Sequence, residues 1–333
     1  MKKWGRIMFK KVLSAILMVC LCLIVMVGCE SSKKDSNSTN TSATSVKVKN
    51  QDDPIILATM TDEESRIIGS MMKQVLEANG YLVDSRVGTF NNTTLARQSL
   101  MQKQVELSMD YTGRGMMFIK NVDIKKYQSD LKTAFETTKE ADAKNGITWI
   151  CYSKYNNTDG IAVSKKWAEE NKIKTFDDFA KYINSGKEMK LAIAGEDSYA
   201  ATAPTCLPGW EKAYGFKLSD KQVVVGVNDP KTMVANNTDG ILACHTYTTA
   251  GTLEALDLVV IEDPKMVAPV YSPAPIALPD LLEKYPEIEG LMKQIFESLD
   301  AQKMMHMNKQ LSVDGKSETD IAREYLKSSG ILK

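Results

Sequence analysis

The chain has 333 residues, of which 42 are basic and 42 acidic, so its formal net charge is zero. A balanced charge provides no broad basic field, which excludes the usual signature of a nucleic-acid-binding protein. The chain has two histidines and neither a Gly-x-Ser-x-Gly nor a His-Glu-x-x-His motif, so we expect no catalysis and no cofactor.

The first 28 residues have the pattern of a lipoprotein signal peptide. Basic residues precede an apolar run that ends in Gly28-Cys29, and a small residue before a cysteine is typical of the cleavage site. An uncleaved membrane anchor is the alternative, but the run is shorter than the ~20 residues that a span needs. The polar residues 29–52 are expected to form a flexible tether. Cys29 is therefore predicted to carry a lipid on the extracellular face of the cell membrane.

Beyond the tether, short apolar runs alternate with amphipathic segments. Thr61 and Glu64 have capping-box spacing and predict a helix that ends at Asn79-Gly80. We expect strands at 54–58, 82–87, 105–109, 147–152, 160–163, 191–194, 223–227, 240–244 and 257–262. Further helices are expected at 93–104, 123–145, 164–172, 175–185, 208–214, 229–236, 279–297, 300–311 and 317–329. This alternation predicts an α/β protein with open, largely parallel sheets covered by helices on both faces.

Several short motifs follow one another in a fixed order along the whole chain after residue 54. They are Asp110-Tyr111-Thr112-Gly113, Tyr155-Asn156-Asn157-Thr158, Pro208-Gly209-Trp210 with Tyr214-Gly215, residues 247–251, residues 257–263, and Pro269-Val270-Tyr271 with Ala274-Pro275. Together they resemble the extracellular substrate-binding proteins of glycine betaine/carnitine/choline ABC importers, the Opu/ProX type. The resemblance implies a two-lobed, periplasmic-binding-protein-like (type 2) fold with a hinged ligand cleft. Lobe 1 would comprise residues 53–157 and 270–333, and lobe 2 residues 158–269.

That family holds its ligand in a box of tyrosines. A quaternary ammonium group has no N–H to donate, but aromatic faces attract it by roughly 0.5–2 kcal/mol per contact. The resemblance places Tyr111, Tyr247 and Tyr271 at box positions, with Thr112 beside the first. The alternative from the residues alone is that each tyrosine packs at a strand end with its hydroxyl bonded to the backbone.

The chain also departs from the family at the site. Asp159 stands where the family has a further tyrosine, and Ala203 stands where it has a basic residue that can hold a ligand carboxylate. A desolvated Asp159 would attract a bare cation and repel a ligand carboxylate, unless Arg114 or Arg97 compensates. We therefore expect choline-like ligands to be preferred over zwitterions if Asp159 faces the cleft. Alternatively, Asp159 is exposed to solvent or paired with a lysine.

The resulting prediction is a monomeric, lipid-anchored protein that captures a small organic cation and delivers it to a membrane ABC permease. A different small polar solute, or a role as a surface chemosensory receptor on the same fold, remain alternatives.

Other chemistry-bearing residues are predicted to be structural. Cys151, Cys206 and Cys244 have the character of buried hydrophobes, although one disulfide pair remains open. Cys244 and His245 would point to opposite faces of a strand. Residues 304–307, Met-Met-His-Met, are interpreted as core rather than a copper site, and Trp149, Trp167 and Trp210 as packing residues, with Trp210 close enough to the cleft to form a wall.

Overall fold

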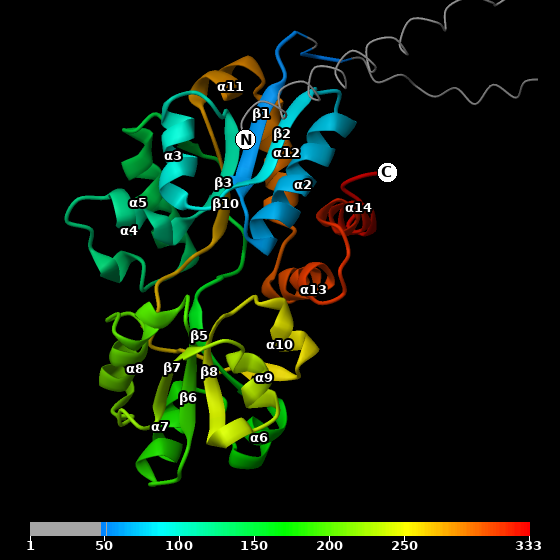
Figure 1. Cartoon of the computed structure of the whole chain (residues 1–333). Coiled ribbons are helices and arrows are strands. Elements are labelled where there is room, and N and C mark those ends of the chain that lie inside the picture. Colours follow the sequence, from blue (N-terminus) through cyan, green and yellow to red (C-terminus); the bar gives the residue numbers. More distant parts are fainter. Residues whose placement is uncertain (1–47, 51) are drawn as a thin grey trace, which may run out of the picture. The chain divides into compact units, whose positions relative to one another are not determined.

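The computed structural model describes residues 48–50 and 52–333 (Figure 1). The predicted signal peptide, Cys29 and nearly all of the predicted tether lie outside the described residues. Within the described part of the chain, no helix is long and apolar enough to cross a membrane.

Two five-stranded sheets organise the protein. The first has the order β2-β1-β3-β10-β4 and comprises β1 (Ile55–Met60), β2 (Val83–Phe90), β3 (Leu107–Tyr111), β4 (Thr148–Trp149) and β10 (Pro273–Ala277). The second has the order β7-β6-β8-β5-β9 and comprises β5 (Asp159–Ser164), β6 (Lys190–Ala194), β7 (Val223–Val227), β8 (Ile241–Tyr247) and β9 (Leu258–Val260).

Helices cover both sheets. Those that accompany the first sheet are α2 (Glu63–Ala78), α3 (Thr93–Met101), η1 (Thr112–Arg114), α4 (Gly115–Phe118), η2 (Ile124–Lys126), α5 (Leu131–Ala143), α11 (Pro279–Lys284), α12 (Glu287–Phe296), α13 (Ala301–Ser312) and α14 (Glu318–Ser328). Those that accompany the second are α6 (Lys165–Asn171), α7 (Phe176–Asn184), η3 (Ser198–Ala201), α8 (Leu207–Tyr214), α9 (Pro230–Ala235), η4 (Thr238–Gly240) and α10 (Gly251–Ala255).

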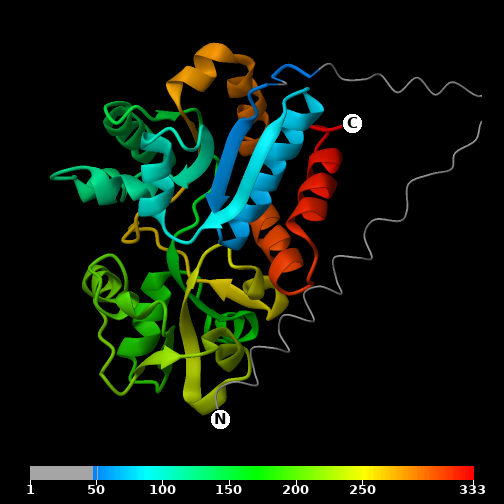
Figure 2. The same cartoon turned by 45° about the horizontal axis from the view of Figure 1, so that its top comes forward.

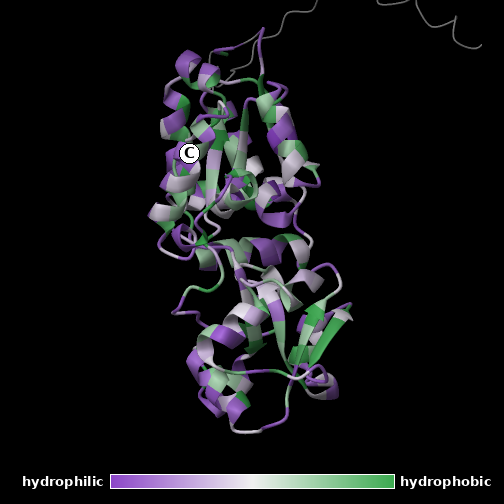
Figure 3. Ribbon diagram, turned by 90° about the vertical axis from the view of Figure 1, so that its left-hand side faces the viewer, coloured by the Kyte–Doolittle hydropathy of each residue, from purple (hydrophilic) through white to green (hydrophobic). Residues whose placement is uncertain are grey.

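Each sheet with its helices forms one lobe, and the chain passes between the lobes twice. It leaves lobe 1 after β4, enters lobe 2 at β5, and returns between β9 and β10 (Figure 1). The lobe limits expected from the sequence, 157/158 and 269/270, fall inside these two connections. Hydrophobic residues concentrate in the strands of both lobes (Figure 3).

The sheets are mixed rather than largely parallel. In each, two neighbouring strand pairs are parallel and two are antiparallel. The antiparallel pairs all involve β10 or β5, the strands that directly follow a crossing between lobes. Strand–helix alternation within a lobe produces parallel neighbours, but a strand that arrives from the other lobe enters its sheet in the opposite direction.

Strand β10 was not expected from the sequence, because its segment contains two prolines and prolines are unusual inside a sheet. Pro273 and Pro275 nevertheless lie between β3 and β4. Their carbonyls accept hydrogen bonds from the backbone N–H groups of Ser153 (2.9 Å) and Ile150 (3.0 Å). The two prolines therefore take part in the sheet as hydrogen-bond acceptors, through their carbonyls.

Helix boundaries differ from the prediction where a local signal was misread. The side chain of Asp62, not Thr61, caps α2 by accepting from the backbone N–H of Ser65. The predicted helix 279–297 is two helices, because Pro286 interrupts it. The predicted helix 123–145 is divided into η2 and α5, with Asp130 capping the latter.

The lobes also touch where α10 packs against α13 (Figure 2). Gly251 makes this approach possible: a Cβ there would lie 2.2 Å from the backbone nitrogen of Lys309. The contact holds the segment that follows β8 against lobe 1.

Candidate ligand-binding site

A pocket of about 560 Å³ lies between the lobes, and both crossing segments contribute to it. This volume suits a small organic ligand. Its lining residues are Met60, Asp62, Tyr111, Arg114, Asn157, Thr158, Asp159, Tyr199, Thr205, Tyr247 and Tyr271. A second cavity, of about 630 Å³, lies beside α6 and β9 of lobe 2 and has lysine and glutamate side chains but no aromatic ring in its lining. The pocket between the lobes is therefore the candidate site, because its aromatic rings match those expected from the sequence.

Four of the five residues expected at the site line this pocket: Tyr111, Asp159, Tyr247 and Tyr271. Thr112 does not. It is fully buried. Its hydroxyl donates a hydrogen bond to the carbonyl of Val270 at 3.3 Å and accepts one from the backbone N–H of Ser272 at 3.0 Å. Thr112 therefore joins the start of η1 to the returning chain behind the pocket.

Tyr199 is a fourth aromatic wall that the sequence reasoning missed. It lies on η3, which follows the carboxyl end of β6, the usual place for ligand contacts in a parallel arrangement. Its hydroxyl donates to Asp159 Oδ1 at 2.6 Å and lies 3.0 Å from the hydroxyl of Tyr247. Burial and the neighbouring carboxylate raise the pKa of Tyr199, so its hydroxyl stays protonated and able to donate.

Asp159 faces the pocket but does not stand there as an isolated charge. His245 Nε2 lies 2.8 Å from its Oδ1, and His245 Nδ1 lies 3.5 Å from Oδ2 of Asp197. Burial alone would lower the pKa of His245, but the hydrogen bond with Asp159 and the negative charges of Asp159 and Asp197 outweigh it and raise the pKa. The alternatives of an exposed Asp159 or a lysine partner are wrong: its side chain is 10% exposed and its partner is His245.

Arg114 brings a positive charge to the pocket. Its nearest carboxylate oxygen belongs to Asp110, 4.0 Å from Nε, and among the described residues this buried Nε has no hydrogen-bond partner. Arg97 is not available, because Asp142 binds its two terminal nitrogens at 2.9 and 2.5 Å. The pocket lining thus combines tyrosine rings with the guanidinium of Arg114 and the carboxylates of Asp62 and Asp159.

The same architecture occurs in known proteins. Residues 53–328 match the family described as "Substrate binding domain of ABC-type glycine betaine transport system". The chain belongs to this family.

Individual relatives agree with this assignment. "Glycine betaine-binding protein YehZ" of Escherichia coli is 32% identical over 285 residues, covering 84% of this chain and 92% of that protein. "Glycine-betaine-binding protein" of Pseudomonas aeruginosa is 26% identical over 278 residues, with 82% and 86% covered. The solved structure of apo YehZ from E. coli superposes with a TM-score of 0.74 at 30% identity, covering 84% of this chain and 99% of that one. The chain is therefore a substrate-binding component of a glycine betaine/carnitine-type ABC importer, and not an enzyme.

In this binding protein, the buried carboxylate of Glu64 connects tyrosines of lobe 1 to lobe 2 and to the crossing segment. Glu64, near the start of α2, accepts from the hydroxyls of Tyr111 (3.1 Å) and Tyr155 (2.8 Å) through Oε1. Its Oε2 accepts from Thr249 of lobe 2 at 2.8 Å and from Asn157 of the crossing segment at 3.3 Å. Because the Tyr111 hydroxyl is held by Glu64, the ring of Tyr111 is fixed in orientation at the pocket wall.

Three other groups that the sequence singled out lie outside the lining of this pocket. Trp210 is 1% exposed and stacks on Phe176 inside lobe 2, so it is not a pocket wall. Met304 and Met307 lie in the core of lobe 1, whereas His306 is exposed. The three cysteines in the described residues are buried and free, which leaves no disulfide pair among them.

Proposed function

We propose that the interlobe pocket binds a small betaine, with its quaternary ammonium in the tyrosine cage beside Asp159 and its carboxylate at Arg114. The observation that carries this is a pocket wall that combines tyrosine faces from both lobes with the guanidinium of Arg114 and the carboxylates of Asp62 and Asp159. Tyrosine faces and Asp159 suit the cation, and Arg114 suits the carboxylate. The names of the relatives, glycine betaine- and carnitine-binding proteins, support the same ligand class.

The charge arrangement changes the selectivity expected from the sequence. A preference for choline rested on an Asp159 without a compensating cation. Instead, His245 pairs with Asp159, and Arg114 lines the same pocket. The repulsion of a ligand carboxylate by Asp159 is therefore offset, and we expect glycine betaine and carnitine to bind more tightly than choline.

Calorimetry with glycine betaine, carnitine and choline tests this assignment. Arg114→Gln removes the group that would hold the carboxylate, and a charged hydrogen bond is worth about 1.5–3 kcal/mol. We expect about 10- to 100-fold weaker binding of the zwitterions and little change for choline. Arg323→Gln is the matched control, because Arg323 is an exposed arginine on α14 that pairs with Asp320 outside the pocket. Equal losses for glycine betaine and choline in Arg114→Gln would show that Arg114 does not bind the ligand carboxylate.

The cage is tested separately. Tyr247→Ala and Tyr271→Ala each remove one ring and should weaken all three ligands by about 2- to 30-fold, the range of one cation–π contact. If either variant keeps full affinity for every quaternary ammonium, that ring does not form part of the cage. If none of the three ligands binds the unaltered protein, the pocket serves a different small polar solute.

We further propose that Cys29 carries the lipid anchor and that the anchored monomer delivers its ligand to a membrane ABC permease. The signal-peptide pattern at 1–28 supports the anchor, and the family supports the permease. Replacing Cys29 with Ala should release the protein from the membrane fraction into the medium. Retention of that variant in the membrane would contradict lipidation at Cys29.

A further inference from the structure

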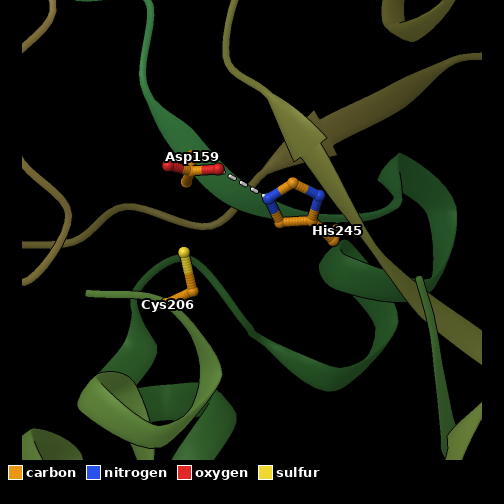
Figure 4. A group of neighbouring side chains, drawn as sticks. All are labelled: Asp159, Cys206 and His245. Carbon is orange, nitrogen blue, oxygen red and sulfur yellow. Dashed lines mark hydrogen bonds and ion pairs between the residues drawn. The ribbon is translucent and has the colours of Figure 1, made fainter. Parts of the chain in front are cut away.

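We propose that Asp159, Cys206 and His245 form a binding site for a divalent metal ion of the zinc type. One potential ligand atom from each residue lies within 4.8 Å of the other two. Figure 4 shows the thiol of Cys206 directed toward the carboxylate of Asp159 and the imidazole of His245. No other comparable group of three occurs among the described residues.

The local fold brings these three residues together from distant parts of the sequence. Asp159 begins β5, and His245 lies on the adjacent antiparallel strand β8, where it is in register with Ile161. Cys206 immediately precedes α8, in the N-cap position. All three therefore belong to lobe 2, so the site does not depend on how far the lobes are open.

The residue types fit the preferences of Zn²⁺. Thiolate sulfur, imidazole nitrogen and carboxylate oxygen are its usual protein ligands, and three protein ligands with an open fourth position are common. Asp159 also lines the ligand pocket, so the open position would face that pocket. Cys244 is equally buried and adjacent in sequence to His245, but neighbouring residues of a strand point to opposite faces, so its thiol lies on the other face of β8.

Neighbouring side chains are placed where they would orient the proposed metal ligands. Oδ2 of Asp197 lies 3.5 Å from Nδ1 of His245, and a carboxylate in this position typically orients a metal-binding histidine. In the described structure this Nδ1 is buried without a hydrogen-bond partner. A metal on Nε2 would fix the proton on Nδ1, where it faces Asp197. Tyr199 in turn orients the carboxylate of Asp159.

Metal binding at the three residues would be coupled to proton release. Zn²⁺ binds the deprotonated forms of its ligands, so forming the Zn–S bond to Cys206 would release the thiol proton to solvent, and Nε2 of His245 would bind the metal through its lone pair.

A Co²⁺ titration without any organic ligand tests the site independently of the proposed function. We expect the metal-stripped protein to bind about one equivalent and to develop the near-ultraviolet absorption of a thiolate–cobalt bond, which Zn²⁺ then abolishes by displacement. Cys206→Ser should lose this band, and Cys244→Ser, the matched control, should keep it. Asp197→Asn should weaken Zn²⁺ binding by about 10- to 100-fold.

The unaltered protein shows whether a thiolate binds the metal at all, and the comparison of Cys206→Ser with Cys244→Ser assigns that thiolate to Cys206. If Co²⁺ produces no thiolate band, or if Cys206→Ser keeps the band, Asp159 and His245 form an ion pair and nothing more. If the band forms, Zn²⁺ should also weaken betaine binding, because it would occupy the carboxylate of Asp159. Only this last consequence rests on the proposed function, and failure of betaine to bind would leave the metal site standing.

Discussion

Replacing Gly251 with alanine should push α10 away from α13 and destabilise the contact between the lobes. The Cβ that Gly251→Ala introduces would lie 2.2 Å from the nitrogen of Lys309, 2.4 Å from the carbonyl carbon of Asn308 and 2.6 Å from the Cα of Lys309. All three are backbone atoms of α13, so no side chain can rotate out of the way.

The size of the effect follows from the required movement. To bring the shortest of these distances from 2.2 Å to 3.0 Å, the lower limit for real Cβ contacts, the helices must separate by at least 0.8 Å. Forced overpacking of this kind costs about 1–3 kcal/mol. At about 2–4 °C per kcal/mol, the melting temperature should fall by roughly 2–12 °C. The shift would also strain the 2.8 Å hydrogen bond from Thr249 to Glu64, so betaine affinity should fall as well.

Gly290→Ala is the matched control, because Gly290 lies within α12 and nothing approaches its Cβ position within 4 Å. Alanine there should stabilise the protein by about 0.5–1 kcal/mol through helix propensity. Thermal and urea denaturation of both variants, followed by calorimetry with betaine, measure the two effects. If Gly251→Ala melts at or above the temperature of the unaltered protein, the close approach of α10 to α13 does not exist in solution.

Two further perturbations concern buried charges of lobe 1. Asp142 accepts hydrogen bonds from Arg97 and, at 2.7 Å, from the indole of Trp149. Asp142→Asn should therefore lower the free energy of unfolding measured in urea by about 3–5 kcal/mol and leave betaine affinity unchanged. An unchanged free energy of unfolding would show that this ion pair contributes nothing to stability. Burial raises the pKa of Asp110 from 3.8 to about 6, so the folded state binds its proton more tightly than the unfolded chain does, and this group makes stability fall as pH rises from about 4 to 6. Asp110→Asn should remove that fall from unfolding free energies measured between pH 4 and 7, and an identical slope in the variant would contradict it.

The sequence predicted the parts of the fold that depend on neighbours along the chain. Strand β7 has its predicted limits, and the helix expected at 175–185 is α7, which begins after its capping residue Thr175. Motif order placed Tyr111, Tyr247 and Tyr271 at one pocket, although they come from β3, β8 and the returning segment. The prediction missed strand β10. Proline has a low strand propensity because it lacks a backbone N–H, and propensity contains no information about which strands lie beside a segment in the fold.

The charge balance of the site could not be predicted for a similar reason. Asp159 and His245 are 86 positions apart, and they meet because β5 pairs antiparallel with β8 in a register that brings Asp159 opposite Tyr247. A slip of one residue in that register would turn the imidazole to the opposite face, away from Asp159. No local pattern of residues encodes this register, so the sequence did not identify His245 as the partner of Asp159.

A tyrosine ring does lie beside Asp159, although the sequence comparison led us to expect none there. Tyr199 reaches the pocket from η3 and donates its hydroxyl to the aspartate that replaced the missing ring. Aspartate at 159 therefore serves the cage twice: its charge suits a cation, and its oxygen fixes the ring of Tyr199. Asp159→Asn should keep an acceptor for Tyr199 but remove the charge, whereas Asp159→Ala removes both. If Asp159 also matters because it positions the ring of Tyr199, calorimetry should show weaker betaine binding by Asp159→Ala than by Asp159→Asn. Equal affinities of the two variants would show that Asp159 acts through its charge alone.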